Sequence, residues 1–249
     1  MNRQSIFLAS CAVAPQYGPS IDAARQIMEL QARGDFSYFD HGPLDQLKEK
    51  AALLLGTTES NISFLKNTTE GLSLIAAGYP WKDGDEIIST AVEYPANHYP
   101  WRLAEKRGAI LKEIVPDERH RWSLDQLQNL ISPRTRVIAL SHVQFTSGLA
   151  LNLEELSRIS REHDIDLILD AAQSLGALPI DAERSGAAAI AASGWKWLLG
   201  PTGTGLLYTT PRLRKKLSLV FAGAETMRQG ADYLNHSWDP HESGKFFEY

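Results

Sequence analysis

Short apolar runs alternate with longer amphipathic segments along most of the chain, and this pattern is typical of an α/β protein with a mainly parallel sheet. The segment Leu153–His163 shows the helical period, because Leu156 and Ile159 follow at helical spacing and charged residues occupy the opposite face. A helix of this kind packs on a sheet and returns the chain to a parallel strand. We therefore expect helices packed on a mainly parallel sheet.

The apolar runs and the amphipathic segments also give the bounds of the expected elements. The expected strands are Ile62–Leu65, Glu86–Thr90, Ile110–Val115, Val137–Ser141, Leu167–Asp170, Ala188–Ala192 and Gly205–Tyr208. The expected helices are Leu44–Leu55, Thr69–Ala77, Pro100–Arg107, Leu124–Leu130, Leu153–His163 and Pro211–Leu219. From residue 221 to residue 249 the period is lost and Gly, His, Asp and aromatic residues are frequent, so we expect an irregular tail or a linker.

The composition excludes several classes of protein. The 249 residues include 25 Lys and Arg against 30 Asp and Glu, and this lack of a basic excess argues against a nucleic-acid partner. No apolar run approaches the ~20 residues of a membrane-spanning helix, so we expect no membrane partner. The single cysteine excludes an intrachain disulfide framework and a cysteine-cluster zinc site, and we expect no metal.

The N-terminus resembles a targeting signal only superficially. Met1-Asn2-Arg3 precedes an apolar run, and Leu8-Ala9-Ser10-Cys11 imitates a lipoprotein cleavage box. Only four apolar residues precede Ser10 and Cys11, whereas a signal peptide needs an apolar region of about 7–15 residues. We therefore expect a cytoplasmic protein in which residues 6–14 form the first buried segment and Cys11 is a small apolar residue within it.

Polar residues at the carboxyl ends of the expected strands are the first candidates for chemistry, because ligands of open α/β sheets bind at that edge. Asp170 follows three apolar residues, and a carboxylate in this position is costly to bury unless a cation meets it. Gln173 lies three residues further on, so both side chains can face one pocket. The alternative is a structural role in which Asp170 caps the following turn.

A lysine follows the next expected strand in an unusual setting. Lys196 lies between Trp195 and Trp197 and precedes the glycine-rich stretch 200–205. In a partly desolvated pocket its pKa would fall, and the neutral amine would be a nucleophile able to form a Schiff base. The alternative is a lysine whose aliphatic stem lies along aromatic rings while its ammonium group reaches water.

Two further segments follow expected strands. Thr68 and Thr69 stand at the start of an expected helix, where hydroxyls and free backbone N–H groups suit phosphate, although threonine at a helix start is also routine. Tyr94 follows the strand Glu86–Thr90, and a ligand ring can stack on its face; aromatic residues here can equally cover the sheet edge. No P-loop or Rossmann fingerprint is present, so no motif supports nucleotide binding.

Four of these segments, in this order, resemble one family. They are Asn67-Thr68-Thr69-Glu70, Glu93-Tyr94-Pro95-Ala96-Asn97, Asp170-Ala171-Ala172-Gln173 and Ser193-Gly194-Trp195-Lys196. The chain is similar to the class V aminotransferase superfamily of pyridoxal-phosphate (PLP) enzymes, which includes cysteine desulfurases, selenocysteine lyases, kynureninases, isopenicillin-N epimerase-like proteins and aminotransferases. The likeness extends from Phe7 to Glu248. Each motif is weak alone, whereas four in this order are specific together.

The resemblance implies a role for each matching residue. Lys196 would hold the cofactor through a Schiff base and move the α-proton of the substrate. Asp170 would pair with the pyridinium nitrogen and keep it protonated, so that the ring accepts electrons. Gln173 would hydrogen-bond the ring 3-oxygen, and Tyr94 would stack on the ring. The residues implied to hold the phosphate are Thr68, Thr69, Ser193 and Trp195.

The resemblance also implies an organisation and a function. The fold would be the three-layer large domain of fold-type I PLP transferases, with an N-terminal segment at 1–20, a PLP-binding large domain at 21–220 and an irregular tail at 221–249 that leads toward a missing C-terminal small domain. A homodimer is expected, because the family builds each site from two subunits. The expected function is PLP-dependent transamination, desulfurase or lyase chemistry, or epimerisation of an amino-acid substrate through Lys196. The alternative is a truncated, catalytically inactive PLP-binding domain.

One residue and the C-terminal end depart from the family pattern. Family members continue past the position of Tyr249 into a small domain that carries the arginine for the substrate carboxylate, and we expect this chain to lack that domain. Phe145 stands where desulfurases have an asparagine near the cofactor and the substrate, which weakens the desulfurase interpretation. Cys11 lies near the N-terminus, whereas the reactive cysteine of desulfurases belongs to the small domain, so Cys11 is not assigned a role. The roles implied for Asp170 and Lys196 lead to one central expectation: the two side chains flank a ring-sized gap at the edge of the sheet.

Overall fold

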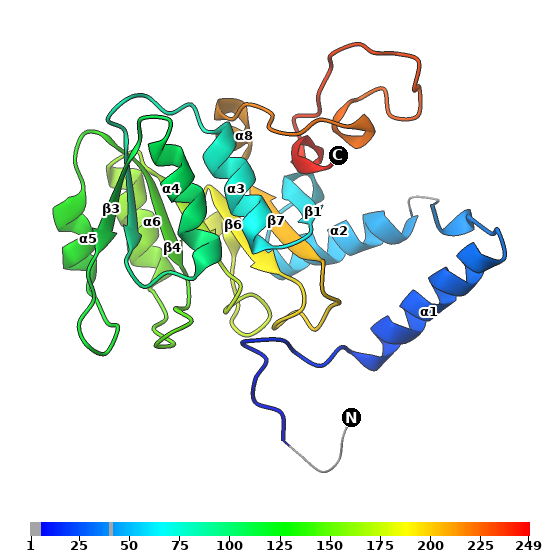
Figure 1. Ribbon diagram of the computed structural model, residues 1–249, viewed down its shortest axis with the longest axis horizontal. Coiled ribbons are helices and arrows are strands. Elements are labelled where there is room, and N and C mark those ends of the chain that lie inside the picture. Colours follow the sequence, from blue (N-terminus) through cyan, green and yellow to red (C-terminus); the bar gives the residue numbers. More distant parts are fainter. Residues whose placement is uncertain (1–5, 40–41) are drawn as a thin grey trace.

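The computed structural model describes residues 6–39 and 42–249, and within them the chain forms a seven-stranded sheet in the order β1-β7-β6-β5-β4-β2-β3 (Figure 1). The strands are β1 (Ile62–Leu65), β2 (Glu86–Thr90), β3 (Ile110–Ile114), β4 (Thr135–Ser141), β5 (Asp166–Asp170), β6 (Ala189–Ser193) and β7 (Gly205–Thr209). Every expected strand is present, and their ends differ from the expected ends by two residues at most.

The directions of the strands bring several strand ends to one edge of the sheet. The neighbouring strands from β3 to β6 are parallel, and β7 is antiparallel to both β6 and β1. Because β1 and β6 are both antiparallel to β7, they run in the same direction as each other. The carboxyl ends of β1, β2, β4, β5 and β6 therefore share an edge, and the expectation of a mainly parallel sheet is confirmed.

Helices connect these strands. The α-helices are α1 (Gly18–Ala32), α2 (Gly42–Leu55), α3 (Thr68–Gly78), α4 (Tyr99–Glu105), α5 (Leu124–Leu130), α6 (Leu153–Glu162), α7 (Ala182–Ser185) and α8 (Pro211–Lys216). The 3-10 helices are η1 (Ser37–Phe39), η2 (Glu59–Asn61), η3 (Pro95–Asn97), η4 (Ala224–Thr226) and η5 (Gly244–Phe247). All expected helices are present, whereas α1 and the single turn α7 were not expected.

Local sequence explains how a helix such as α6 forms and packs. Its start is capped by Asn152, whose side chain accepts hydrogen bonds from the backbone N–H groups of Glu154 and Glu155. Its buried face carries Leu156 and Ile159, as the helical spacing of apolar residues predicts. By contrast, α1 buries none of its 15 residues.

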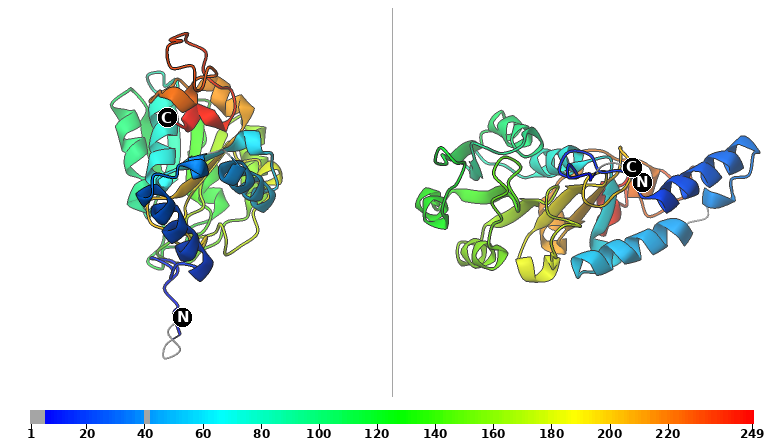
Figure 2. Two further views of the ribbon diagram at one scale, coloured as in Figure 1. Left: turned by 90° about the vertical axis from the view of Figure 1, so that its right-hand side faces the viewer. Right: turned by 90° about the horizontal axis from the view of Figure 1, so that it is seen from below.

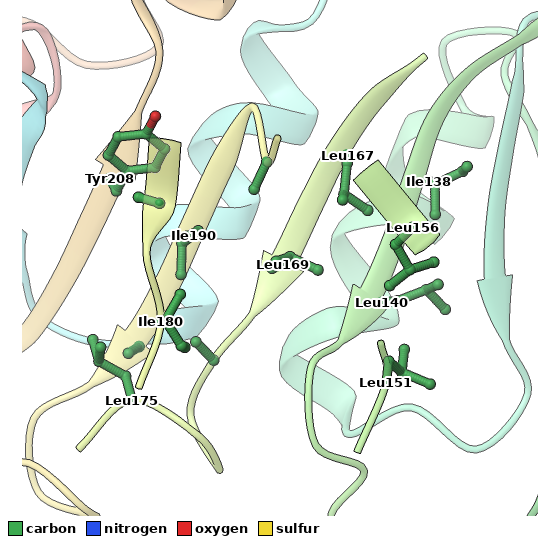
Figure 3. Packing of buried hydrophobic residues seen from close by; sticks show 14 of the residues in the cluster. Ile138, Leu140, Leu151, Leu156, Leu167, Leu169, Leu175, Ile180, Ile190 and Tyr208 are labelled. Carbon is green, nitrogen blue, oxygen red and sulfur yellow. The ribbon is translucent and has the colours of Figure 1, made fainter. Parts of the chain in front are cut away.

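The apolar core has two parts, one on each face of the sheet. Successive residues of a strand point to opposite faces, so Ile138 and Leu140 belong to the cluster shown in Figure 3, whereas Val137 and Ala139 belong to the other cluster. Residues of α2, α5 and α6 complete the first cluster, and residues of α3, α4 and α8 complete the second. The chain is therefore a three-layer α/β structure.

The N-terminal segment differs from the expectation. Phe7 and Leu8 are exposed, and so is Cys11, so the prediction of a buried first segment was wrong. The segment runs along the loops at the carboxyl edge of the sheet instead of entering the core, and Ala14 is buried where its N–H donates to the Trp195 carbonyl at 2.9 Å. The helix α1 then leads away from the sheet (Figures 1 and 2).

The tail, residues 221–249, is fastened to the β1 side of the sheet. The Phe247 side chain is buried in the second core cluster. The Glu248 carboxylate accepts hydrogen bonds from Lys48 Nζ at 2.8 Å and from the Phe64 N–H at 3.1 Å. A Cβ at Gly244 would lie 2.0 Å from the Ile62 carbonyl oxygen, so only glycine allows this close approach. The tail thus packs on the same body as the sheet.

Among the helices of the described ranges, none combines the length and apolarity that a membrane span requires. No group of three or more His, Cys, Asp or Glu side chains suited to a metal ion occurs in the part of the chain that the structure describes.

Candidate active site

The loops at the carboxyl edge of the sheet, together with the N-terminal segment, enclose a cavity of about 570 Å³. The structure brings every site residue indicated by the sequence to the wall of this cavity. These residues are Thr68, Thr69, Tyr94, Asp170, Gln173, Ser193, Trp195 and Lys196. The acid and the amine of the central expectation therefore face one common space.

Asp170 is the last residue of β5 and is 4% exposed. Its Oδ1 accepts a hydrogen bond from the Ala172 N–H at 2.8 Å, so it caps the following turn as well as lining the cavity. Burial, together with the negative charge of Glu93, raises the pKa of Asp170 to about 7, while the Ala172 N–H and the Lys196 charge oppose the rise. A buried carboxyl group with a raised pKa is well suited to pair with a positively charged N–H group of a ligand.

Lys196 lies in the loop that follows β6. Burial lowers the pKa of its ammonium group, although the charges of Asp170 and Cys11 act in the other direction. The Nζ atom lies over the Tyr94 ring, 5.2 Å from its centroid, and the Tyr94 ring packs edge-on against Phe145 at 5.2 Å. The amine thus faces the cavity against an aromatic ring, a contact that favours its charged form, whereas burial favours its neutral, nucleophilic form.

The start of α3 forms the hydroxyl-rich end of the cavity. Asn67 caps the helix by accepting from the Glu70 N–H at 2.8 Å. The Oγ1 of Thr68 lies 2.8 Å from the Oγ of Ser193, which also accepts from the Thr68 N–H at 3.2 Å. A Cβ at Gly205 would lie 2.9 Å from the backbone of Asn67, so this glycine allows β7 to approach the turn before α3. Ser193, at the end of β6, thereby adds its hydroxyl to that of Thr68 at the start of α3, which suits an anion.

Gln173 and Trp195 are both joined to the N-terminal segment. The Gln173 Nε2 donates to the Cys11 carbonyl at 2.8 Å, and its Oε1 accepts from Trp197 Nε1 at 3.0 Å. The Trp195 carbonyl accepts from the Ala14 N–H at 2.9 Å. The N-terminal segment is therefore a wall of the site, and the side-chain amide that the resemblance directs to a ring oxygen is bonded to the backbone of that wall.

The chemistry of these groups fits PLP. The hydroxyls and N–H groups at the start of α3 suit the phosphate group, and the Tyr94 ring suits stacking on a pyridine ring. The buried carboxyl of Asp170 suits a protonated ring nitrogen, and the amine of Lys196 suits an aldehyde. No arginine occurs among the described residues that line the cavity, and Asp170 and Lys196 are the acid and the basic residue on its wall.

Some residues of the cavity wall were missed by sequence reasoning. Ser141 ends β4 beside Asp170, and the rule that selected other strand-end residues would have found it. The residues Cys11, Ala12 and Val13 also line the cavity. The N-terminal segment is held at the site by the hydrogen bond between Gln173 and the Cys11 carbonyl, residues that are 162 positions apart. The local sequence of the segment gives no sign of this long-range contact.

Comparison with known proteins supplies the family. The family model for aminotransferase class-V matches residues 40–244. The chain belongs to the class-V aminotransferase family. This class-V chain is 28% identical over 231 residues to a probable cysteine desulfurase of Methanothermobacter thermautotrophicus. The aligned region covers 90% of this chain and 58% of that protein. It is 35% identical over 191 residues to a probable cysteine desulfurase of Mycolicibacterium paratuberculosis, covering 75% of this chain and 27% of that protein.

Solved structures of class-V relatives match the fold. The apo cysteine desulfurase of Thermococcus onnurineus NA1 has a TM-score of 0.84 at 25% identity, covering 98% of this chain and 62% of that one. A mutant of the cystine C–S lyase C-DES with glycine covalently linked to its PLP cofactor has a TM-score of 0.85 at 25% identity, covering 96% and 65%. These matches confirm the expected family, its fold and PLP as the cofactor of the relatives. The class-V chain spans less than two thirds of the length of these relatives.

Proposed function

We propose that this chain binds PLP in the cavity at the carboxyl edge of the sheet and acts with it on an amino-acid substrate, with cysteine as the first candidate. One observation carries the proposal: Asp170 and Lys196 line one cavity of about 570 Å³ beside a hydroxyl-rich helix start. The cysteine desulfurases and the cystine C–S lyase among the relatives favour desulfurase or lyase chemistry over transamination and epimerisation. Phe145 on the cavity wall remains the feature that argues against a desulfurase.

Each of these side chains of the cavity has a separate proposed role. The Lys196 Nζ would attach the cofactor and then take the proton from the α-carbon of the substrate. Asp170 would hold a proton on the ring nitrogen, and Tyr94 would exclude water from one face of the ring. Gln173 would donate to the ring 3-oxygen in place of the Cys11 carbonyl. PLP itself supplies an electron-withdrawing ring that accepts the electron pair left on the substrate. The phosphate would be held by Thr68, Thr69, Ser193 and Trp195.

The first experiment tests cofactor binding and turnover together. PLP is added to the purified chain, and a visible absorption band of the bound cofactor is expected because the amine of Lys196 faces the cavity. L-Cysteine is then added, and the products alanine, pyruvate and sulfide are measured. In separate reactions, L-aspartate and L-alanine, each with a keto acid, are tested as alternative substrates. A colourless protein whose tryptophan fluorescence does not respond to PLP would contradict the proposal.

A second candidate function is PLP binding without turnover. It is favoured by the lack of an arginine among the described residues of the cavity wall, because a substrate carboxylate finds no clamp there apart from Lys196. The same experiment separates the two functions. A visible band with no product from any of the amino acids supports the second candidate, and product formation excludes it.

We also propose that the chain forms a homodimer through α1 and α2. Within α1, Ile27 is 44% exposed and Met28 is 60% exposed, and Leu53 of α2 is 76% exposed. Figure 2 shows both helices extending from the body of the molecule, where a second copy can cover them. Light scattering is expected to give about twice the 27.6 kDa of one chain. A mass of one chain at every concentration would count against the dimer.

A cytoplasmic location and the lack of a nucleic-acid partner stay predictions of the sequence, as does the division into a segment at 1–20, a large domain at 21–220 and a tail at 221–249.

A further inference from the structure

Glu93 is a buried acid beside the cavity that the proposed roles leave unused. It follows β2, directly before Tyr94, and is 7% exposed. Its Oε1 accepts from the Ser141 N–H at 2.8 Å and from Gln144 Nε2 at 2.7 Å, and its Oε2 accepts from the Ser141 hydroxyl. Burial raises the pKa of Glu93, whereas the hydrogen bonds from Ser141 and Gln144 act in the other direction. Three donors on two carboxylate oxygens suit the ionised form, which only accepts hydrogen bonds.

The hydrogen bonds to Ser141 place Glu93 next to Asp170. Ser141 at the end of β4 pairs with Asp170 at the end of β5, and residues paired in this way lie about 4.8 Å apart with side chains on the same face. Ser141 also lines the cavity. The Glu93 carboxylate is thus held one strand away from the Asp170 carboxylate, and both are buried, so that like charges interact more strongly than in water.

The charged and titratable neighbours of Asp170 come from three loops. Glu93 follows β2, Lys196 follows β6, and His142 follows β4 and donates its backbone N–H to the Asp170 carbonyl at 2.9 Å. Burial lowers the pKa of His142, so its ring is neutral near pH 7. Cys11, on the N-terminal segment, acts on Lys196 rather than on Asp170. Among the described residues of these loops, Glu93 is therefore the second acid that faces Asp170.

We propose that Glu93 is a positioning residue: held on Ser141, it places a second negative charge behind Asp170 and thereby strengthens the bond between Asp170 and a protonated pyridine nitrogen. It acts through Asp170 and does not itself touch the cofactor. The inference rests on the proposed function, because it assigns Asp170 to the ring nitrogen of PLP. It adds a buried acid to the site and gives the glutamate of the Glu93-Tyr94 segment a defined electrostatic task.

The test uses Glu93→Gln, which keeps the shape of the side chain and removes its charge. Carbon-13 NMR of the aspartate carboxyl groups follows the titration of Asp170 in the cofactor-free chain, and its signal is assigned by its loss in Asp170→Asn. The titration midpoint of Asp170 is expected to fall by about one pH unit in Glu93→Gln, because a nearby like charge is removed. Glu93→Asp, which restores the charge, is expected to recover most of that shift.

The matched control is Glu86→Gln, the same change at the opposite end of β2. Glu86 is also buried and bonded, to Lys112, Ser132 and Arg134, and it lies away from the cavity. This variant is expected to leave the Asp170 midpoint unchanged. A folded Glu93→Gln chain with the wild-type midpoint would overturn the inference.

Two further readouts keep the inference testable if Glu93→Gln does not fold and separate it from the proposed function. In the wild-type chain the signals of Glu93 and Asp170 are expected to share inflections, because coupled acids titrate as a pair; independent single titrations would overturn the inference. In PLP-loaded protein, the pH midpoint of the visible band is expected to fall in Glu93→Gln. A chain that does not bind PLP would contradict the proposed function. If the chain binds PLP but Glu93→Gln has the wild-type titration midpoint of Asp170, only this inference is contradicted.

Discussion

Lys196→Ala is expected to abolish the visible absorption band of the PLP-loaded chain and to lower turnover by at least about 10⁴-fold. The Lys196 Nζ is the amine that faces the cavity, 5.2 Å from the centroid of the Tyr94 ring, and burial lowers its pKa toward the neutral, nucleophilic form. Without it, neither covalent attachment of the cofactor nor transfer of the α-proton has a residue to perform it. The measurements are the absorption spectrum and the rate of product formation.

The control for this substitution is Lys50→Ala, which removes an exposed lysine of α2. It is expected to leave the spectrum and the turnover rate unchanged. If Lys196→Ala retained the visible band at wild-type intensity, another amine would hold the cofactor, and the assignment of Lys196 would fail.

Asp170→Asn is expected to change both the catalytic rate and the pH dependence of stability. Asparagine can still accept the hydrogen bond from the Ala172 N–H, but it cannot hold a proton on a ring nitrogen, so turnover is expected to fall by about 10²–10⁴-fold.

In the cofactor-free chain, the same substitution is expected to remove roughly 2–3 kcal/mol of the change in unfolding free energy between pH 5 and pH 8.

The direction of this pH effect follows from proton binding. Burial raises the pKa of Asp170 from 3.8 to about 7, so the folded chain holds a proton that the unfolded chain has released across that range. The contribution of Asp170 to stability is therefore complete below pH 3.8 and is lost as the pH rises through 7. The free energy of unfolding, measured with urea at pH 5 and pH 8, is expected to decline more in the wild type than in Asp170→Asn. Asp232→Asn, at an exposed position of the tail, is the control and keeps the wild-type decline.

Much of the site could be predicted because strand ends are visible in a sequence. Asp170 and Ser193 each follow an apolar run, and parallel strands with a common direction bring such residues to one edge. The resemblance added roles that spacing alone left open, since Asp170 as a turn cap and Thr68 as an ordinary helix start were equally consistent with the residues. The structure shows that Asp170 is both a turn cap and a wall of the cavity.

The parts that could not be predicted depend on contacts between distant residues. The apolar composition of residues 6–14 suggested burial, but the segment lies on the loops of the site because the Cys11 carbonyl accepts from Gln173, 162 positions away. The helix α1 was not expected, and none of its residues is buried. Glu93 belonged to a recognised motif, yet its burial and its bonds to Ser141 require β2 and β4 to be neighbours in the sheet.

The sequence by itself determined the order of strands and helices, the residues at the strand ends and the family, because these depend on local periodicity and short motifs. Only the tertiary structure decided which of these residues share a cavity, that the N-terminal segment is one of its walls, and that Glu93 lies behind Asp170. The physical reason is that burial and electrostatic coupling are properties of the packed sheet: the same carboxylates in an extended chain are far apart, hydrated and independent.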